Sequence, residues 1–206
     1  MTINEWSNQN WDEAQKWESE WWRGVNGACS NTYAEETKQL TYAYKMGLTA
    51  YVGPGTWPCY DMTGYSVLDI GGGPTSILLK CTSLGKKTKV IDPCSFPSWV
   101  QSRYYKAGIG YERLRGEDIN LDEHWDEAWL YNVLQHTEDP ELIIMKAKAV
   151  ASVVRIFEWI DIPPHQGHPQ ELKEENLNKW LEGTGTVEWL NENNCGGKAY
   201  YGVFRY

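Results

Sequence analysis

The sequence has few cysteines and no long apolar run, and both shortages narrow the kinds of protein it can be. Its five cysteines are odd in number, scattered, and never form a CxxC pair, so neither a disulfide framework nor a zinc site is expected. No stretch approaches the roughly 20 apolar residues that a membrane-spanning helix needs, and the polar N-terminal stretch lacks the apolar core of a signal peptide. These features predict a cytoplasmic protein with free thiols and no membrane contact.

Basic residues are also scarce. Lys and Arg number 19 against 28 Asp and Glu, which gives a formal net charge of −9. Such a surface repels a nucleic-acid backbone, so nucleic acid is not expected as a partner. The 206 residues, 41% of them hydrophobic, are enough for one globular unit with a sizeable core.

The stretch around which the chain is organised is residues 66–76, SVLDIGGGPTS. Its first five residues have the apolar, β-branched character of a buried strand. The glycines at 71–73 then remove every Cβ where the backbone turns and a ligand can approach closely. Pro74 suits the first turn of a helix, which we expect over residues 74–84. A strand, a glycine turn and a helix N-terminus form a nucleotide-type binding loop.

Strand and helix patterns alternate through the rest of the chain, and the last two β-rich segments (186–190 and 199–206) are expected to pair as a hairpin. This alternation predicts a doubly wound α/β fold, with a mostly parallel sheet covered on both faces and ligands at the carboxyl ends of its strands. The other expected strands are 89–92, 111–114, 127–134 and 153–160, and the other expected helices are 97–106, 139–149 and 169–183.

Two amphipathic helices are expected before the first strand, over residues 10–23 and 33–46. The first carries four tryptophans on one face, and this face either packs on the body of the protein or lines a substrate pocket, since flat rings suit sugars and other ring ligands. We expect residues 1–63 to form an N-terminal helical cap or lid and residues 64–206 to form the core, together one compact unit.

Asp69 lies two residues before the first glycine. A carboxylate there disfavours a pyrophosphate and favours a ligand that carries an ammonium and a sulfonium. The stretch DIGGG resembles motif I, acidic-x-Gly-x-Gly, of the class I S-adenosylmethionine (SAM)-dependent methyltransferases, with a threonine in place of the third glycine of the fuller motif. The resemblance implies four SAM-binding residues: Asp69, Gly71, Gly72 and Gly73.

A second, correctly ordered match lies at residues 125–143, WDEAWLYNVLQHTEDPELI, where Asn-x-Leu-x-His-x-x-Asp-Pro follows a strand pattern. Two motifs together are more specific than either alone. The family's seven-stranded sheet, whose last strand is antiparallel, also agrees with the expected hairpin. The resemblance implies further cofactor contacts from Asp92 to the ribose, from Asp118 and Ile119 to the adenine, and from Asn132 and Val133 to the methionyl ammonium.

His136 is the candidate general base, because imidazole titrates near neutral pH and can take a proton from a hydroxyl nucleophile. A structural role in orienting its loop remains the alternative. His165 and His168 lie three residues apart on a loop at the same edge, which makes a poor metal site, and no metal is expected. The resemblance implies methyl transfer from SAM to oxygen or nitrogen of a small-molecule or sugar-like acceptor.

Two other functions stay open. An NAD(P)-dependent oxidoreductase shares the glycine turn and the acid at Asp92, although Asp69 and the terminal hairpin disfavour it. A non-catalytic module of the same fold would bind SAM, or a partner protein, without turnover.

Overall fold

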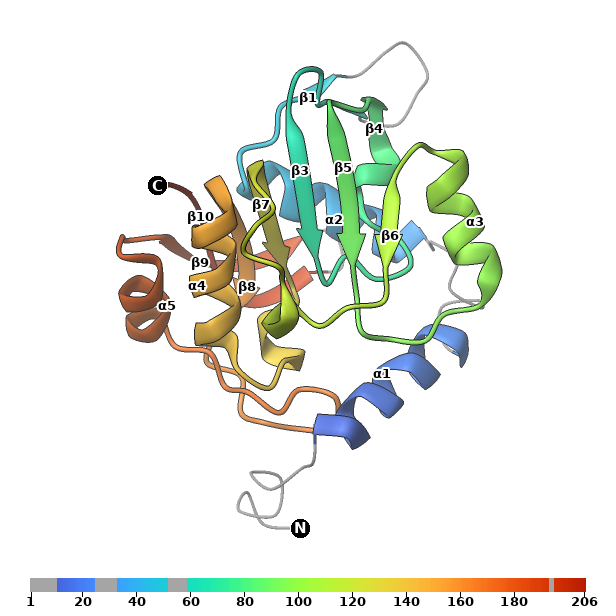
Figure 1. Cartoon of the computed structure of the whole chain (residues 1–206). Helices are drawn as coiled ribbons and strands as arrows, with labels where there is room; N and C mark the ends of the chain where they lie inside the picture. The colour runs from blue at the N-terminus through green and yellow to red at the C-terminus, as the bar shows by residue number, and fades with distance from the viewer. Residues whose placement is uncertain (1–10, 25–32, 52–58, 193–194) are drawn as a thin grey trace.

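A central sheet with helices on both faces makes up most of the computed structural model, which describes residues 11–24, 33–51, 59–192 and 195–206 (Figure 1). Its seven strands have the order β6-β5-β3-β7-β8-β10-β9. The first five run parallel, and β10 pairs antiparallel with both β8 and β9. The strand bounds are β3 Ser66–Ile70, β5 Lys87–Ile91, β6 Gly110–Glu112, β7 Trp125–Tyr131, β8 Ala151–Trp159, β9 Thr186–Glu192 and β10 Cys195–Arg205.

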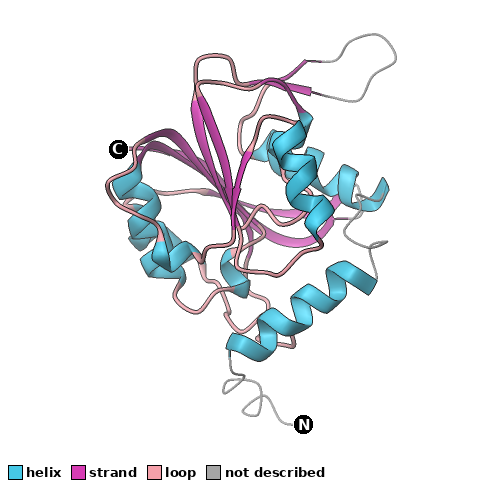
Figure 2. Ribbon diagram, turned by 45° about the vertical axis from the view of Figure 1, so that its right-hand side comes forward, coloured by secondary structure: helices cyan, strands magenta, loops and turns pink. Residues whose placement is uncertain are grey.

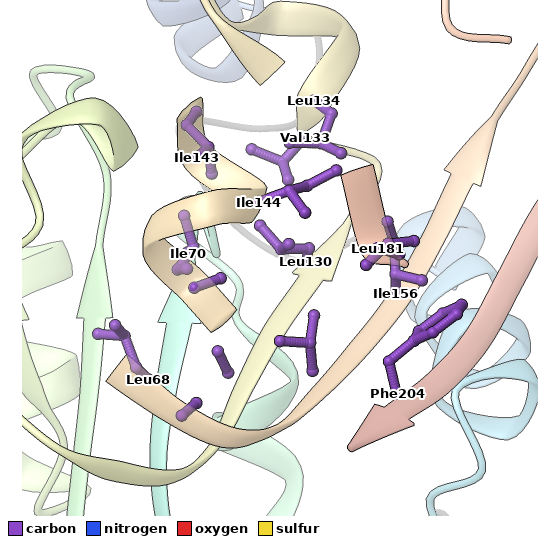
Figure 3. Packing of buried hydrophobic residues seen from close by; sticks show 14 of the residues in the cluster. Leu68, Ile70, Leu130, Val133, Leu134, Ile143, Ile144, Ile156, Leu181 and Phe204 are labelled. Carbon is purple, nitrogen blue, oxygen red and sulfur yellow. The ribbon is translucent and has the colours of Figure 1, made fainter. Parts of the chain in front are cut away.

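Two apolar clusters hold the helices to the two faces of the sheet, which Figure 2 shows close to edge-on. Helices α4 (Pro140–Val150) and α5 (Glu174–Leu181) cover one face, and their side chains pack against the strands in the cluster drawn in Figure 3. Helices α2 (Tyr33–Lys45) and α3 (Ser98–Lys106) cover the other face. The predicted doubly wound, mostly parallel seven-stranded sheet with a terminal antiparallel hairpin is confirmed.

The prediction of a helix over residues 74–84 is wrong. Only one 3₁₀ turn, Ile77–Lys80, follows the glycines, and the next residues form β4, Cys81–Ser83. Ser76 caps this 3₁₀ turn by accepting from the N–H of Leu78. The turn does not continue as a helix because residues 81–83 pair with β2 (Cys59–Asp61) instead. Strand β4 thereby completes a small sheet with β2 and β1 (Ala50–Tyr51).

The helix expected from residue 169 also begins later, at Glu174. Backbone groups of the preceding segment form hydrogen bonds with residues outside it. The N–H of Gln170 donates to the carbonyl of Gln135 (3.2 Å), and the carbonyl of Leu172 accepts from the N–H of Asp161 (2.9 Å). These bonds keep the segment extended beside the carboxyl edge of the sheet.

Helix α1, Trp11–Gly24, has the bounds that the tryptophan spacing predicted to within one residue. It crosses beneath the carboxyl ends of β3 and β5 (Figure 1). Side chains tie it to the core: Gln15 donates to the carbonyl of His136 (3.0 Å), and Arg23 donates to that of Ser95 (2.6 Å). Parts of the expected cap (1–10, 25–32 and 52–58) lie outside the described residues, and the boundary near residue 63 stays a prediction. None of the described helices is long and apolar enough to cross a bilayer.

Candidate active site at the carboxyl edge of the sheet

The three glycines form a tight turn between β3 and the 3₁₀ turn. Gly71 and Gly73 have φ values of +73° and +61°, in the left-handed region that favours glycine. A Cβ on Gly72 would lie 2.6 Å from Asp69 Oδ2, so the middle residue also has no room for a side chain. The turn therefore presents bare backbone to the space above it.

Asp69 lies directly beneath this turn and is fully buried. Its Oδ2 accepts hydrogen bonds from the hydroxyls of Tyr131 (2.6 Å) and Ser76, while its Oδ1 has no partner among the described residues. Burial raises the pKa of this carboxyl to about 7, and the charge of Asp92 acts in the same direction. A positive charge in the space above the turn would offset that cost.

Asp92 follows β5 and joins the glycine turn to the next loop. Its Oδ2 accepts from the N–H of Gly73 (3.0 Å) and its Oδ1 from the N–H of Cys94 (2.8 Å). Burial raises the pKa of Asp92 to about 6, with the charge of Glu18 contributing. Each oxygen keeps lone pairs, so this carboxylate can still accept hydrogen bonds from a diol.

The loop after β7 is held from below by Glu158, which the sequence reasoning missed. This carboxylate, on β8, is fully buried and accepts from the N–H groups of Val133 (3.0 Å) and Leu134 (3.1 Å). Burial raises the pKa of Glu158 to about 8. Asn132, at the start of the loop, has a φ of +51°, which turns the backbone toward the glycines. The signal in the sequence was one acid in an otherwise apolar strand end, IFEW.

A cavity, hereafter the inner cavity, lies between the glycine turn, the β7 loop and helix α1. It brings together most of the predicted site residues. Asp69 lies beneath its floor rather than in its wall. The predicted residues in its lining are Gly71, Gly72, Gly73, Asp92, Asn132, Val133 and His136.

Asp118 and Ile119 do not line the inner cavity. They border a separate hollow with Leu68 and Trp125, because the 3₁₀ turn Gly116–Asp118 directs the neighbouring Glu117 toward the inner cavity instead. Glu117 Oε1 accepts from the N–H groups of residues 138 and 139 at 3.1 and 3.2 Å, which fixes its position. The acid that the turn presents is one residue earlier than expected.

Helix α1 forms the wall opposite the glycines, so its aromatic face lines a pocket as well as packing on the core. Trp11 covers the guanidinium of Arg115, with 4.2 Å from Cζ to the ring centroid. Trp22 faces the glycine turn, since a Cβ on Gly73 would lie 3.7 Å from Trp22 Cζ2. Gln15 joins the wall to both neighbouring loops, since it donates to His136 and its Oε1 accepts from Cys94 Sγ at 3.4 Å.

His136 has a defined tautomer. Its Nδ1 lies 2.8 Å from the carbonyl oxygen of Gly167, and because a carbonyl only accepts, we assign the proton to Nδ1 and the lone pair to Nε2. Glu18 Oε2 lies 3.6 Å from the same Nδ1. The rings of His136 and His168 meet edge to face with centroids 4.3 Å apart. Within the described ranges, no group of three or more His, Cys, Asp or Glu side chains is arranged to hold a metal ion.

A glycine turn after a buried acid, a second acid after the next strand and an antiparallel last strand together define the class I methyltransferase arrangement. No family model matches the sequence, and no curated protein matches it either. Solved structures do match. Magnesium protoporphyrin IX methyltransferase from Synechocystis, with bound S-adenosylhomocysteine (SAH), aligns over 95% of this chain and 97% of its own at 13% identity, with a TM-score of 0.67.

Two further matches are N-methyltransferases. The 1,6-didemethyltoxoflavin-N1-methyltransferase of Burkholderia thailandensis aligns over 93% of this chain and 86% of its own, at 14% identity and a TM-score of 0.62. NodS of Bradyrhizobium japonicum aligns over 97% of both chains, at 14% identity and a TM-score of 0.59. The chain thus has the fold of the class I SAM-dependent methyltransferases, and the resemblance drawn from its sequence is confirmed at the level of the fold.

Proposed function

We propose that this protein binds SAM in the inner cavity and transfers its methyl group to a small molecule. The observation that carries the proposal is the glycine turn itself. Val133 leaves no room for a side chain at Gly71, and Asp69 leaves none at Gly72. The turn lies above a buried carboxyl whose Oδ1 has no hydrogen-bond partner among the described residues. That combination suits a cation held close to bare backbone.

The residues around the cavity fit the parts of SAM. The free lone pairs of Asp92 accept from the ribose hydroxyls, and the backbone at Gly71 and Asn132 faces the methionyl end. On the adenine side we assign Glu117 in place of Asp118, because Glu117 is the acid in the lining. Ile143 and Val133 supply apolar contacts there.

His136 is the proposed general base. When bound, SAM supplies a methyl group already activated by the sulfonium, so the protein has to orient the acceptor and remove its proton. The hydrogen bond from Nδ1 to the carbonyl of Gly167 keeps the lone pair on Nε2. The amide nitrogen of Gln135 lies 3.5 Å from Nε2, so the proton of the acceptor would replace that contact. The carboxylate of Glu18, 3.6 Å from Nδ1, stabilises the imidazolium that forms.

A small-molecule acceptor is supported by the names of the structural neighbours, which include a magnesium protoporphyrin IX methyltransferase and a 1,6-didemethyltoxoflavin-N1-methyltransferase. A sugar-like acceptor rests only on the tryptophans of α1. The oxidoreductase alternative is not favoured, because Asp69 opposes a pyrophosphate in the turn and the sheet ends in an antiparallel hairpin.

Calorimetry with SAM, SAH and NAD tests the cofactor. We expect binding of both adenosyl ligands and none of NAD, and the reverse result would overturn the proposal. Transfer from radiolabelled SAM to a panel of phenols, amines, sugars and tRNA then tests activity. Binding of SAM without transfer to any class would favour the non-catalytic module.

A further inference from the structure

A second cavity, hereafter the outer cavity, adjoins the inner one. The described residues that line both cavities are Glu18, Trp22, Glu35, Tyr42, Asn132 and His136. A molecule in the outer cavity would therefore contact His136. The other lining residues of the outer cavity are Trp17, Trp21, Lys38, Gln135, Trp159, Ile162, His165, His168 and Gly196.

The walls of the outer cavity are mainly aromatic. Four tryptophans reach it, three from α1 and one from the end of β8. The rings of Trp21 and Trp22 meet at 83° with centroids 5.0 Å apart, and Trp159 Nε1 donates to the hydroxyl of Tyr42 at 3.4 Å. Rings held in this way offer fixed flat faces to a planar ligand.

The charged groups of the outer cavity give it a negative balance. Among the described lining residues the one ammonium, on Lys38, is paired with Glu35 at 2.9 Å, and the carboxylate of Glu18 then remains in excess. His168 adds no positive charge, because burial and the neighbouring His136 and His165 lower its pKa to about 2. Tryptophan faces and a carboxylate attract a cation and oppose an anion.

We propose that the outer cavity is the acceptor site and that it takes a flat aromatic amine carrying positive charge. This inference rests on the proposed function and adds the class of acceptor to it. A carboxylate or phosphate acceptor would meet Glu18 without an unpaired cation in the lining to receive it.

The transfer step is balanced by groups already named. His136 Nε2 takes a proton from the cationic acceptor nitrogen, and the lone pair freed in this way forms the bond to the methyl carbon. The methyl–sulfur bond breaks and its electron pair stays on sulfur. The products are SAH, the N-methylated amine, which carries the positive charge from the sulfonium, and a protonated His136. The carboxylate of Glu18 lies beside that imidazolium.

Three quinolines of the same shape test the acceptor class. They are 4-aminoquinoline, which is cationic at neutral pH, 4-hydroxyquinoline, which is neutral, and quinoline-4-carboxylate, which is anionic. Their affinities are measured by calorimetry on the full chain saturated with SAH. We expect 4-aminoquinoline to bind at least about tenfold more tightly than the carboxylate, with the hydroxyl compound between them.

Two variants locate the binding. Trp21→Leu and Glu18→Gln should each weaken 4-aminoquinoline at least about fivefold in the SAH-saturated protein. The matched controls are Trp189→Leu on β9, where the side chain is 77% exposed, and Glu20→Gln on the exposed side of α1; both should leave the affinity unchanged.

The outcomes separate this inference from the proposed function. If SAH binds but none of the three quinolines does, or the carboxylate binds as tightly as the amine, the inference is overturned while the proposed function stands. If Trp21→Leu leaves 4-aminoquinoline unaffected, the outer cavity is not its site. If SAH itself does not bind, both are overturned.

Discussion

Gly71 and Val133 lie so close that a Cβ on the glycine would be 2.0 Å from Val133 Cγ2. The two residues belong to different motifs, one after β3 and the other after β7, and β3 and β7 are neighbours in the sheet. Their contact closes the floor of the inner cavity. The glycine turn and the β7 loop therefore act as one surface, and a change in either one moves the other.

Gly71→Ala should abolish measurable SAM binding or weaken it at least about tenfold, since the new methyl group collides with Val133 at a backbone position with φ +73°. The matched control is Gly64→Ala, which has a similar φ of +84° but nothing within 4 Å of the added Cβ. Both variants place an alanine at a positive φ, so the difference between their SAM affinities, measured by calorimetry, reports the effect of the collision with Val133. Equal SAM affinity in the two would contradict this account.

Asp92→Asn should raise the Kd for SAM by about tenfold or more, because an amide replaces a carboxylate that accepts from two backbone N–H groups and, in the proposed complex, from the ribose. Asp122→Asn, at an exposed position before β7, is the control. Calorimetry at fixed pH gives both values. An unchanged Kd for Asp92→Asn would remove the ribose contact from the proposal.

Glu158→Gln should change how stability depends on pH. The pKa of this carboxyl is about 8 in the folded protein against an ordinary value of 4.5, so between these pH values the folded state holds more protons than the unfolded state. Stability contributed by the protonated Glu158 is therefore lost as the pH rises from about 4.5 to about 8. The glutamine does not titrate, so the advantage of wild type over the variant shrinks across that window.

We expect that advantage to fall by at least about 1 kcal/mol between pH 5 and pH 8.5, equivalent to at least about 2–4 °C in Tm for a chain of this size. Thermal melts of both proteins at several pH values measure it. Glu141→Gln, at an exposed position on α4, should track wild type at every pH. A Tm difference that stays constant with pH would show that Glu158 is ionised throughout.

His136→Ala should lower turnover by about 10²- to 10⁴-fold, the range typical of a lost general base, while the Kd for SAM stays within about twofold of wild type. His124→Gln, at an exposed histidine before β7, should retain full activity. Unchanged turnover would leave His136 with the structural role alone.

Local patterns in the sequence were enough to predict the seven strands of the main sheet, with ends placed to within about four residues. Strands β3 and β8 are mainly apolar apart from a few polar residues such as Asp69 and Glu158. Helix α4 opens with an Asp–Pro pair whose aspartate caps the helix, accepting from the N–H of Leu142 at 2.9 Å. The tryptophan spacing placed α1. These features depend on neighbours within a few residues, which the sequence shows directly.

Contacts between segments that are distant in the chain could not be predicted from the sequence. Strand β4 exists because it pairs with β2, about twenty residues earlier, and no local pattern reveals that partner. Glu158 acts on N–H groups 24 and 25 positions away. The sequence also could not show that Glu117, and not Asp118, lines the inner cavity. The backbone path of the 3₁₀ turn Gly116–Asp118 decides which of the two neighbouring carboxylates faces it.

The wall shared by the inner and outer cavities has a thermodynamic consequence. Glu18, Trp22 and His136 contact both spaces, so any adjustment of these side chains that accompanies filling one cavity is felt in the other. Linkage then requires reciprocity: whatever factor SAH adds to the affinity for an acceptor, the acceptor must add to the affinity for SAH. The coupling free energy between the two occupancies is therefore carried by the residues of this shared wall.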